Sequence, residues 1–310
     1  MRLKNPVVTI IMATYNRAHF IVETLTSIQN QTFQDWECII IDDGGMDNTE
    51  EVINNFLVND KRFRFLKRTS DYQKGLPGCR NYGLDLAKGM YVIFFDDDDI
   101  VHPQNLEFCK KELDKDISFC RYERAAFSGD FDYNFDLSTQ YESFYIDKND
   151  IEALIKNELP FNSCAVMWKM ECFNENKFIE HLMYAEEWEL YSRILSTGTK
   201  GISIKKTLFY GRKHNNSNTG EFYSNNPVRR KSYAEAILLV VCNLKEKQLL
   251  NYSLKRYFIS LSFNFKEYKL YKKLIDIFEF TTFEKLKWQW FYFVLPLRLK
   301  FTKIKNAAIK

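Results

Sequence analysis

The chain has 310 residues, of which 45% are hydrophobic and 27% charged, which excludes disordered and fibrous proteins and leaves room for two or three structural units. Its seven cysteines include no Cys-x-x-Cys pair, so neither a disulfide framework nor a zinc ribbon is predicted, and a reducing cytoplasm fits best. The net charge of +3 is unevenly spread, because residues 221–310 carry 18 Lys/Arg and 7 Asp/Glu whereas residues 1–220 carry 26 and 34. We expect two parts with different electrostatic partners.

The sequence predicts neither a signal peptide nor a membrane-spanning helix. The apolar run at residues 7–13 is short, and no small-residue cleavage site follows it. The longest late, mostly apolar run is residues 288–297, about half of the roughly 20 residues that a spanning helix needs. We therefore expect a cytoplasmic protein.

Four short segments rich in Val, Ile and Phe are predicted to be buried strands. They are residues 7–13, 36–41, 63–67 and 91–95. Segments with helical periodicity lie between them, as at Ile21, Leu25 and Ile28. This alternation predicts an α/β fold with a mostly parallel sheet and flanking helices. Ligands of such sheets bind at the carboxyl ends of the strands, so the residues there are candidate site residues.

Polar residues follow all four predicted strands. They are Thr14, Tyr15, Asn16 and Arg17 after the first, Asp42 and Asp43 after the second, Arg80 in the segment after the third, and Asp96, Asp97, Asp98 and Asp99 after the fourth. Four consecutive carboxylates repel one another unless a cation or hydrogen-bond donors neutralise them, and Mg²⁺ or Mn²⁺ suits carboxylate oxygens. The alternative is an acidic turn that caps a helix starting near Pro103.

The other strand ends suit a nucleotide. Asp42 and Asp43 would lie level with Tyr15, so a carboxylate could hold a base that stacks on the ring, although Asp and Gly also favour an ordinary turn there. Arg80 follows two glycines near a predicted helix start, where a guanidinium and backbone N–H groups can receive a phosphate. The glycines match neither a P-loop nor a dinucleotide-binding pattern.

Two later motifs are ambiguous by themselves. Glu186 and Glu187 are consecutive acidic residues at the start of a predicted helix, where they can simply oppose the helix dipole. His214 follows Arg212 and Lys213, a context in which histidine is commonly a surface residue.

Together, these motifs resemble glycosyltransferase family 2. They are Thr14-Tyr15-Asn16-Arg17, Asp42-Asp43-Gly44, Arg80-Asn81-x-Gly83, Gly89-x-Tyr91, Asp96 to Asp99, Glu186-Glu187-Trp188 and His214-x-x-Ser217. The resemblance covers about residues 5–220 and implies a GT-A fold. It divides into a nucleotide-sugar-binding half, residues 1–100, and an acceptor-binding half, residues 101–220. Residues 221–310 lie outside it and are expected to form a basic, aromatic-rich helical extension.

The resemblance also implies the roles of the site residues. The donor would be held by Thr14, Tyr15, Asn16, Arg17, Asp42, Asp43, Arg80, Asp96 and Asp97. The metal ligands would be Asp98, Asp96 and His214, with Mn²⁺ or Mg²⁺ as the ion. The family's catalytic base is usually the Asp of a Glu-Asp pair, so this role passes to Glu187, with Glu186 as the next candidate.

The implied activity is inverting transfer of a sugar, from a UDP-sugar above all, to a hydroxyl of a saccharide or lipid-linked saccharide in surface polysaccharide assembly. Trp168, Tyr184 and Trp188 suit stacking on sugars, although core packing is the commoner use of such residues. Two alternatives remain open: a metal-dependent nucleotidyl or phosphoryl transferase, and a non-catalytic nucleotide-sugar-binding protein.

The C-terminal segment predicts a partner of its own. Residues 285–310 hold seven Lys/Arg and no Asp/Glu among several aromatic residues. One face of a predicted helix there would carry Leu297, Phe301, Ile304 and Ala308. Such a segment suits an anionic membrane surface, which would make the enzyme peripheral on the inner face of the cell membrane. The alternative is an aromatic cap on the catalytic domain; no nucleic acid partner is expected, because no binding module accompanies the charge.

Overall fold

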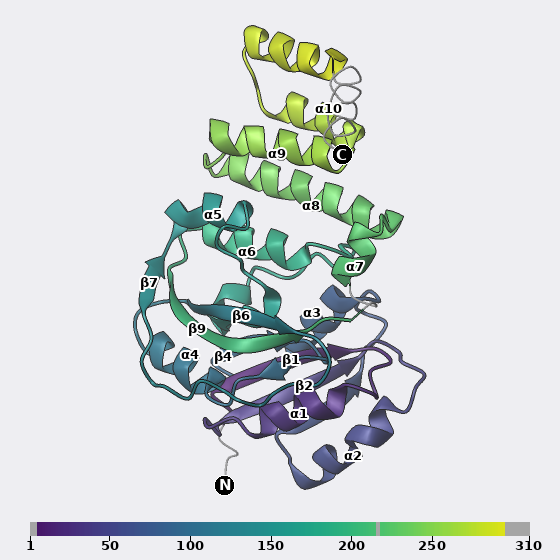
Figure 1. Ribbon diagram of the computed structural model, residues 1–310, viewed down its shortest axis with the longest axis vertical. Coiled ribbons are helices and arrows are strands. Elements are labelled where there is room, and N and C mark those ends of the chain that lie inside the picture. The colour runs from purple at the N-terminus through teal and green to yellow at the C-terminus, as the bar shows by residue number, and fades with distance from the viewer. Residues whose placement is uncertain (1–4, 215–217, 295–310) are drawn as a thin grey trace, which may run out of the picture. The chain divides into compact units, whose positions relative to one another are not determined.

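The computed structural model describes residues 5–214 and 218–294 and forms two compact units, residues 1–247 and 248–310 (Figure 1). Ser217 and the stripe predicted at residues 297–308 lie outside the described residues. Helix α8, Pro227–Glu246, belongs to the first unit. The functional division into residues 1–100, 101–220 and 221–310 stays a prediction.

The first unit contains a nine-stranded sheet in its described part. Its strands are β1 Val8–Thr14, β2 Trp36–Asp42, β3 Phe63–Lys67, β4 Tyr91–Phe95, β5 Ile100–Val101, β6 Phe119–Phe127, β7 Ser143–Ile146, β8 Val166–Lys169 and β9 Gly201–Arg212. They pair in the order β3-β2-β1-β4-β8-β6-β9-β5, and β7 pairs with β9. The four predicted strands are β1 to β4, so the strand prediction is confirmed to within one residue at each end.

The register of the parallel strands brings their polar ends together. Strands β1, β2, β3 and β4 pair in parallel with one another. Thr14 is level with Asp42, and Asp42 is level with Lys67. Met12 is level with Phe95, so the Asp run begins beside the last residues of strand β1. Antiparallel pairs enter with β8, β5 and β7, and the predicted α/β fold with a mostly parallel sheet is confirmed.

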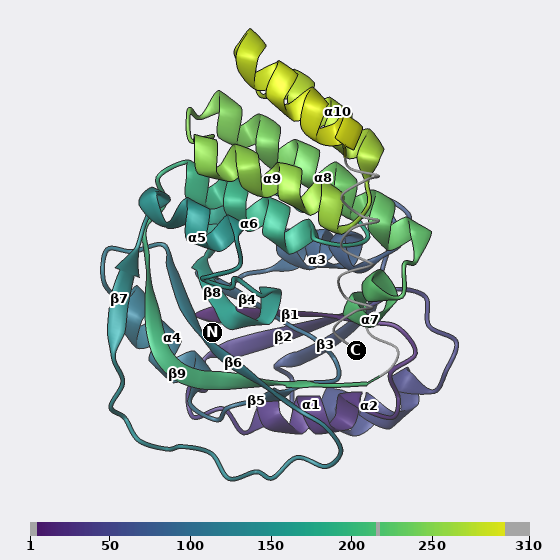
Figure 2. The ribbon, with the colours of Figure 1, turned by 45° about the horizontal axis from the view of Figure 1, so that its top comes forward.

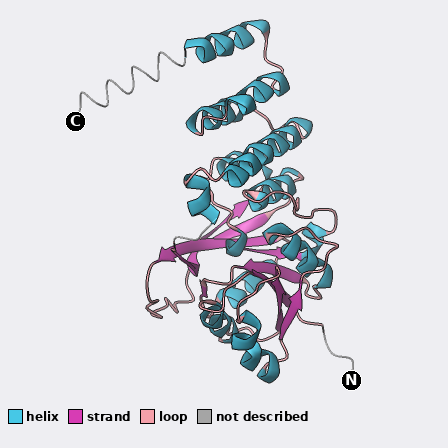
Figure 3. Cartoon of the chain, turned by 90° about the vertical axis from the view of Figure 1, so that its right-hand side faces the viewer, coloured by secondary structure: helices cyan, strands magenta, loops and turns pink. Residues whose placement is uncertain are grey.

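Helices cover both faces of this sheet (Figures 2 and 3). The remaining helices of the unit are α1 Ile21–Gln29, α2 Thr49–Asn59, α3 Leu76–Leu86, α4 Asn105–Leu113, α5 Ile151–Ile155, α6 Glu186–Ser196 and α7 Asn218–Tyr223. The apolar sides of α1, α2 and α4 pack into one core with Ile10 and Met12, whereas Cys79 of α3 packs with Ile39 on the other face. Gly83 lets α3 approach β1 closely, because a Cβ there would lie 2.5 Å from Ile11 Cγ2.

Within residues 248–294, the described part of the second unit, the regular structure is helical. It contains α9 Tyr252–Asn264, α10 Tyr268–Ile277 and a terminal helix, residues 282–294. Phe258, Leu270, Leu274 and Phe278 are buried in it. The predicted helical extension is therefore confirmed. Across residues 5–214 and 218–294, the helices are too short or too polar to cross a membrane.

Candidate active site

The Asp run after β4 lies among basic side chains. Arg17 Nε lies 3.3 Å from Asp97 Oδ1, and Arg17 Nη2 lies 3.7 Å from Asp98 Oδ2. His214 Nε2 lies 2.9 Å from the same Asp98 oxygen, although the two residues are 116 positions apart in sequence. The fold thus brings together Asp98, which follows β4, and His214, which follows β9.

Arg212 supports the contact between Asp98 and His214 through hydrogen bonds to the Asp run. Its backbone N–H donates to Asp99 Oδ1 at 2.7 Å, and its Nε donates to the Asp98 carbonyl at 2.9 Å. Its guanidinium also lies over the rings of Phe20 and Phe127. Because β9 ends at Arg212, these contacts hold His214, two residues later, at the Asp run.

Arg80 joins the other side of the Asp run to helix α6. Its Nη2 lies 3.2 Å from Asp96 Oδ1 and its Nη1 lies 3.2 Å from Glu186 Oε1. Ser163 Oγ accepts a further hydrogen bond from Nη2 at 3.0 Å. The guanidinium, which the sequence assigned to a phosphate, is thus engaged by two carboxylates and a hydroxyl. Its contact with a donor stays a prediction.

Burial and the crowding of acidic groups raise the pKa values of Asp97, Asp99 and Glu186 in this region. The pKa of Asp97 is raised to about 7, first by burial and second by the negative charge of Asp98, while Arg17 opposes the rise. Burial and the charge of Glu187 raise the pKa of Glu186, against the opposing effect of Arg80. Such a site favours an incoming cation.

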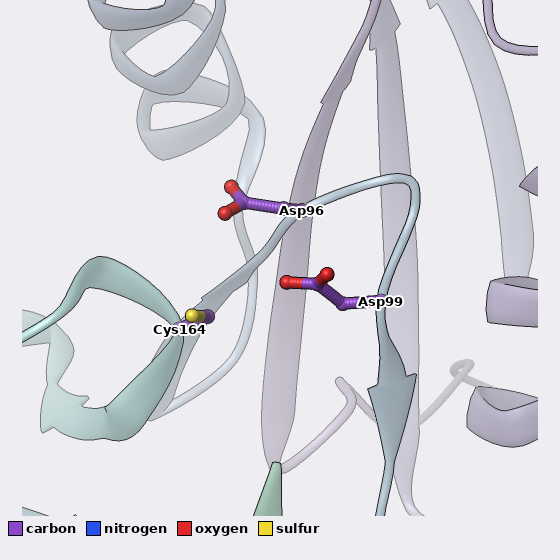
Figure 4. A group of neighbouring side chains, drawn as sticks. All are labelled: Asp96, Asp99 and Cys164. Carbon is purple, nitrogen blue, oxygen red and sulfur yellow. The ribbon is translucent and has the colours of Figure 1, made fainter. Parts of the chain in front are cut away.

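Two groups of side chains offer ligands for that cation. In the described part of the chain, Asp96, Asp99 and Cys164 are the one group of three acidic, histidine or cysteine side chains, with ligand atoms within 4.8 Å of one another (Figure 4). Burial raises the pKa of the Cys164 thiol well above its usual range, so this sulfur stays protonated and does not suit a hard ion. Asp98 and His214, which the sequence assigned to the metal, lie side by side here, and their role as ligands of Mn²⁺ or Mg²⁺ stays a prediction.

The turn after β2 is built by side chains that the sequence assigned to the donor. Asp42 Oδ1 accepts from the Gly45 N–H at 2.9 Å, and Asn16 Oδ1 accepts from the Met46 N–H at 2.7 Å. Asn16 itself has φ 55°, in the left-handed region that asparagine tolerates. Asp42 and Asn16 therefore shape the backbone here, which is the ordinary turn role that the sequence left open for Asp42.

Asp43 and Tyr15 line the same end of the sheet. Asp43 Oδ1 lies 2.6 Å from Arg68 Nε, a partner that the sequence analysis missed. Arg68 directly follows β3, and a scan of every strand end for basic residues would have found it. The Tyr15 ring is 43% exposed, with Lys74 Nζ 4.9 Å from its centre. The Asp43 N–H donates to the Thr14 carbonyl at 2.9 Å, so Asp43 and Tyr15 follow neighbouring strand ends, and their contact with a nucleotide base stays a prediction.

The segment that leads into α6 and Glu187 contains an aromatic residue, Tyr184. Ala185, which precedes the helix, has φ 63° and turns the chain sharply. Tyr184 stacks on Phe222 of α7 with ring centres 4.4 Å apart.

Trp168, by contrast, is 0% exposed and packs against Phe119. The expectation that Trp168 suits stacking on a sugar is therefore wrong, because this side chain belongs to the core.

Residues 9–175, more than half of the chain, match the family model described as Glycosyl transferase family 2. The chain belongs to this family. Family 2 membership and the glycosyltransferase activity expected from the motifs are thereby confirmed. Membership also favours glycosyl transfer over the two alternatives that the sequence left open.

Similar proteins agree with this assignment. Glycosyltransferase GlyG of Streptococcus pneumoniae is 28% identical over 229 residues, which cover 68% of this chain and 72% of GlyG. The UDP-Glc:alpha-D-GlcNAc-diphosphoundecaprenol beta-1,3-glucosyltransferase WfgD of Escherichia coli is 38% identical over 113 residues, 36% of this chain and 43% of WfgD. The crystal structure of S. aureus TarS 1-349 in complex with UDP-GlcNAc superimposes with a TM-score of 0.68 at 19% identity, covering 87% of this chain and 80% of that one. The GT-A fold of this glycosyltransferase is confirmed.

Proposed function

We propose that this family 2 enzyme transfers a sugar from a nucleoside diphosphate sugar, specifically a UDP-sugar, to a hydroxyl of a saccharide or lipid-linked saccharide, with inversion at the anomeric carbon. The observation that carries the proposal is the bridge made by Arg80, which joins Asp96 at the end of β4 to Glu186 at the start of α6. The bridge joins α6, the helix that carries Glu187, to the end of β4, which supports a role for Glu187 at the same site. The similarity to WfgD, which is named as a UDP-glucose-dependent glucosyltransferase acting on a diphosphoundecaprenol-linked sugar, supports this donor and acceptor class.

The donor would lie across the ends of β1, β2 and β4. We propose that Tyr15, Asp43 and Thr14 bind the nucleotide base of the donor, and that Arg68 orients the Asp43 carboxylate. Arg17 keeps about a quarter of its side chain exposed beside Asp97, which suits a contact with the diphosphate. Asp96 or Asp97 would then lie near the ribose.

Asp98 and His214 would hold a divalent ion, Mn²⁺ or Mg²⁺, with Asp96 nearby. When bound, such an ion stabilises negative charge on the departing diphosphate. Arg212 supports this part of the site by anchoring the end of β9 to Asp98 and Asp99.

Glu187 is the proposed catalytic base. Glu186 is 5% exposed and engaged by Arg80, whereas Glu187 is only partly buried in the same helical turn. The Glu187 carboxylate accepts the proton of the acceptor hydroxyl as that oxygen bonds to the anomeric carbon. The bond from this carbon to the diphosphate breaks, and its electron pair leaves with the diphosphate, so the reaction is a single displacement.

The acceptor would approach from the side of Tyr184, which precedes α6 and stacks on Phe222. A lipid-linked acceptor would place the enzyme at the inner face of the cell membrane, in the assembly of a surface polysaccharide. The basic C-terminal part of the chain supports this location.

A transfer assay tests the proposal. The purified chain is incubated with Mn²⁺, a panel of nucleotide sugars and saccharide acceptors, and free nucleoside diphosphate is measured together with glycosylated product. We expect a UDP-sugar to give equal amounts of UDP and product, with the anomeric configuration inverted. Release of pyrophosphate, or tight donor binding without turnover in every combination, would contradict the proposal.

A further inference from the structure

The terminal helix, residues 282–294, carries two apolar faces. Its inner face packs within the second unit: the Tyr271 hydroxyl donates to the Trp288 carbonyl at 2.7 Å, and the Tyr271 and Tyr292 rings stack with centres 5.0 Å apart. Phe291 lies against Phe263, with ring centres 5.2 Å apart. Part of the aromatic content of this segment is thus a cap on its own helical unit.

The outer face of the same helix is a stripe of large apolar side chains. It consists of Phe283, Leu286, Trp290 and Phe293, which are 78%, 59%, 65% and 75% exposed. Their spacings of three, four and three residues put them on one side of a helix with 3.6 residues per turn. Trp290 and Phe293 stack on each other with ring centres 6.0 Å apart. Isolated exposed apolar residues need no explanation, but a continuous exposed stripe marks an interaction surface.

The charge around this stripe decides what it binds. Lys285 and Lys287 are exposed beside it. The unit as a whole, residues 248–310, holds 13 Lys/Arg and 4 Asp/Glu. Two copies of so basic a surface repel each other, whereas a bilayer with anionic headgroups attracts it. Aromatic side chains flanked by lysines are also the composition typical of helices that lie in a membrane interface.

We propose that Phe283, Leu286, Trp290 and Phe293 insert into the surface of an anionic lipid bilayer. The terminal helix then lies in the plane of the interface, with Lys285 and Lys287 at the level of the headgroups. This extends the proposed function, because it holds the enzyme at the surface where a lipid-linked acceptor is found. Binding to lipid does not itself depend on that function.

Vesicle sedimentation of the full chain tests the proposal. Vesicles of phosphatidylglycerol and phosphatidylcholine are compared with vesicles of phosphatidylcholine alone, for the wild type, Trp290→Ser and the matched control Val58→Ser. Val58 is 57% exposed on α2, so both substitutions remove an exposed apolar side chain from a helix. We expect Trp290→Ser to lower the partition coefficient on anionic vesicles by about tenfold or more, and Val58→Ser to leave it unchanged. Equal binding by the two variants, or equal binding of the wild type to both lipids, would overturn the proposal.

Quenching of tryptophan fluorescence by brominated lipids adds a test in which each tryptophan is replaced by another aromatic residue. Brominated anionic lipids are mixed with the wild type, Trp290→Phe and Trp288→Phe. Because Trp290 lies on the outer face and Trp288 on the inner one, we expect Trp290→Phe to bind but lose most of the quenching, and Trp288→Phe to keep it. The reverse pattern would overturn the proposal.

Two further measurements separate this proposal from its alternatives. A Trp290→Ser variant that dissociates a dimer in lipid-free buffer while binding vesicles normally would assign the stripe to a second copy of the chain and overturn the proposal. Transfer to a soluble acceptor should be equal in Trp290→Ser and wild type. Loss of vesicle binding and loss of turnover are therefore independent results.

Discussion

Arg80 and Glu186 form a buried ion pair between residues 106 positions apart, with Nη1 and Oε1 separated by 3.2 Å. Their side chains are 3% and 7% exposed. A buried pair contributes little net stability relative to apolar residues, but the loss of one partner leaves the other charged and without water. This pair therefore links α3, which carries Arg80, to the first turn of α6.

The first prediction concerns this ion pair. Arg80→Met should lower the free energy of unfolding by about 3–5 kcal/mol, the cost typical of breaking one side of a buried pair. The double variant Arg80→Met with Glu186→Gln should recover part of that loss without recovering turnover. Urea unfolding of the wild type, both single variants and the double variant measures the coupling. Additive losses would show that the two side chains do not interact.

The second prediction concerns the metal ligands. Asp98→Asn should weaken Mn²⁺ binding by more than the roughly 10- to 100-fold that changes outside the direct ligands cost. The fold should persist, and the pKa of Asp97 should fall because the charge of Asp98 helps to raise it. Calorimetric titration with Mn²⁺ measures the affinity, with the exposed Asp132→Asn as the control. Wild-type activity of Asp98→Asn at low Mn²⁺ would remove Asp98 from the site.

The third prediction separates the two consecutive glutamates. Glu187→Gln should lower kcat by about 10²- to 10⁴-fold, the contribution typical of a general base, and leave donor affinity unchanged. Glu186→Gln should mainly destabilise the fold, because it leaves the buried Arg80 with less compensating charge. Single-turnover kinetics and donor-binding titrations test the role of Glu187, and thermal unfolding tests the role of Glu186. Full turnover in Glu187→Gln would move the base elsewhere.

The sequence predicted the first half of the fold well for a physical reason. Short continuous apolar runs such as residues 91–95 are typical of strands buried on both faces, and parallel pairing then brings the carboxyl ends of those strands to one edge of the sheet. This is why Asp98 could be placed at the ligand edge without a structure. Its proximity to His214 came from the family resemblance, since no local pattern predicts a contact across 116 residues.

Other side chains could not be assigned from local sequence. Trp168 is in the core because β8 lies between β4 and β6. The alternation of strands and helices in the sequence does not predict this antiparallel strand. Asn16 supports a turn in a segment 30 residues away, which depends on its left-handed backbone. The aromatic residues of the terminal helix divide into a packed face and an exposed face. Composition alone left both interpretations of that segment open.

The fourth prediction concerns Arg229 of α8, which connects three parts of the first unit. Its Nε lies 2.9 Å from Glu221 Oε2 and its Nη2 donates to Asn218 Oδ1 at 2.7 Å, both in α7. Its Nη1 donates to the Met183 carbonyl in the segment that leads to Glu187. We therefore expect Arg229 to position Glu187, the proposed catalytic base.

Replacement of the Arg229 guanidinium should displace Glu187 without changing the affinity for the donor. Arg229→Met should lower kcat with a saccharide acceptor by about tenfold or more, since a displacement of about 1 Å can cost 10²-fold, while donor affinity stays unchanged. Arg229→Lys should recover little, because an ammonium cannot make the three contacts at once. Lys231→Met, at an exposed position of the same helix, is the matched control and should behave as the wild type. Steady-state kinetics with both substrates varied measures the effect. A rise in the donor KM alone would place the action of Arg229 on the nucleotide side rather than at the base.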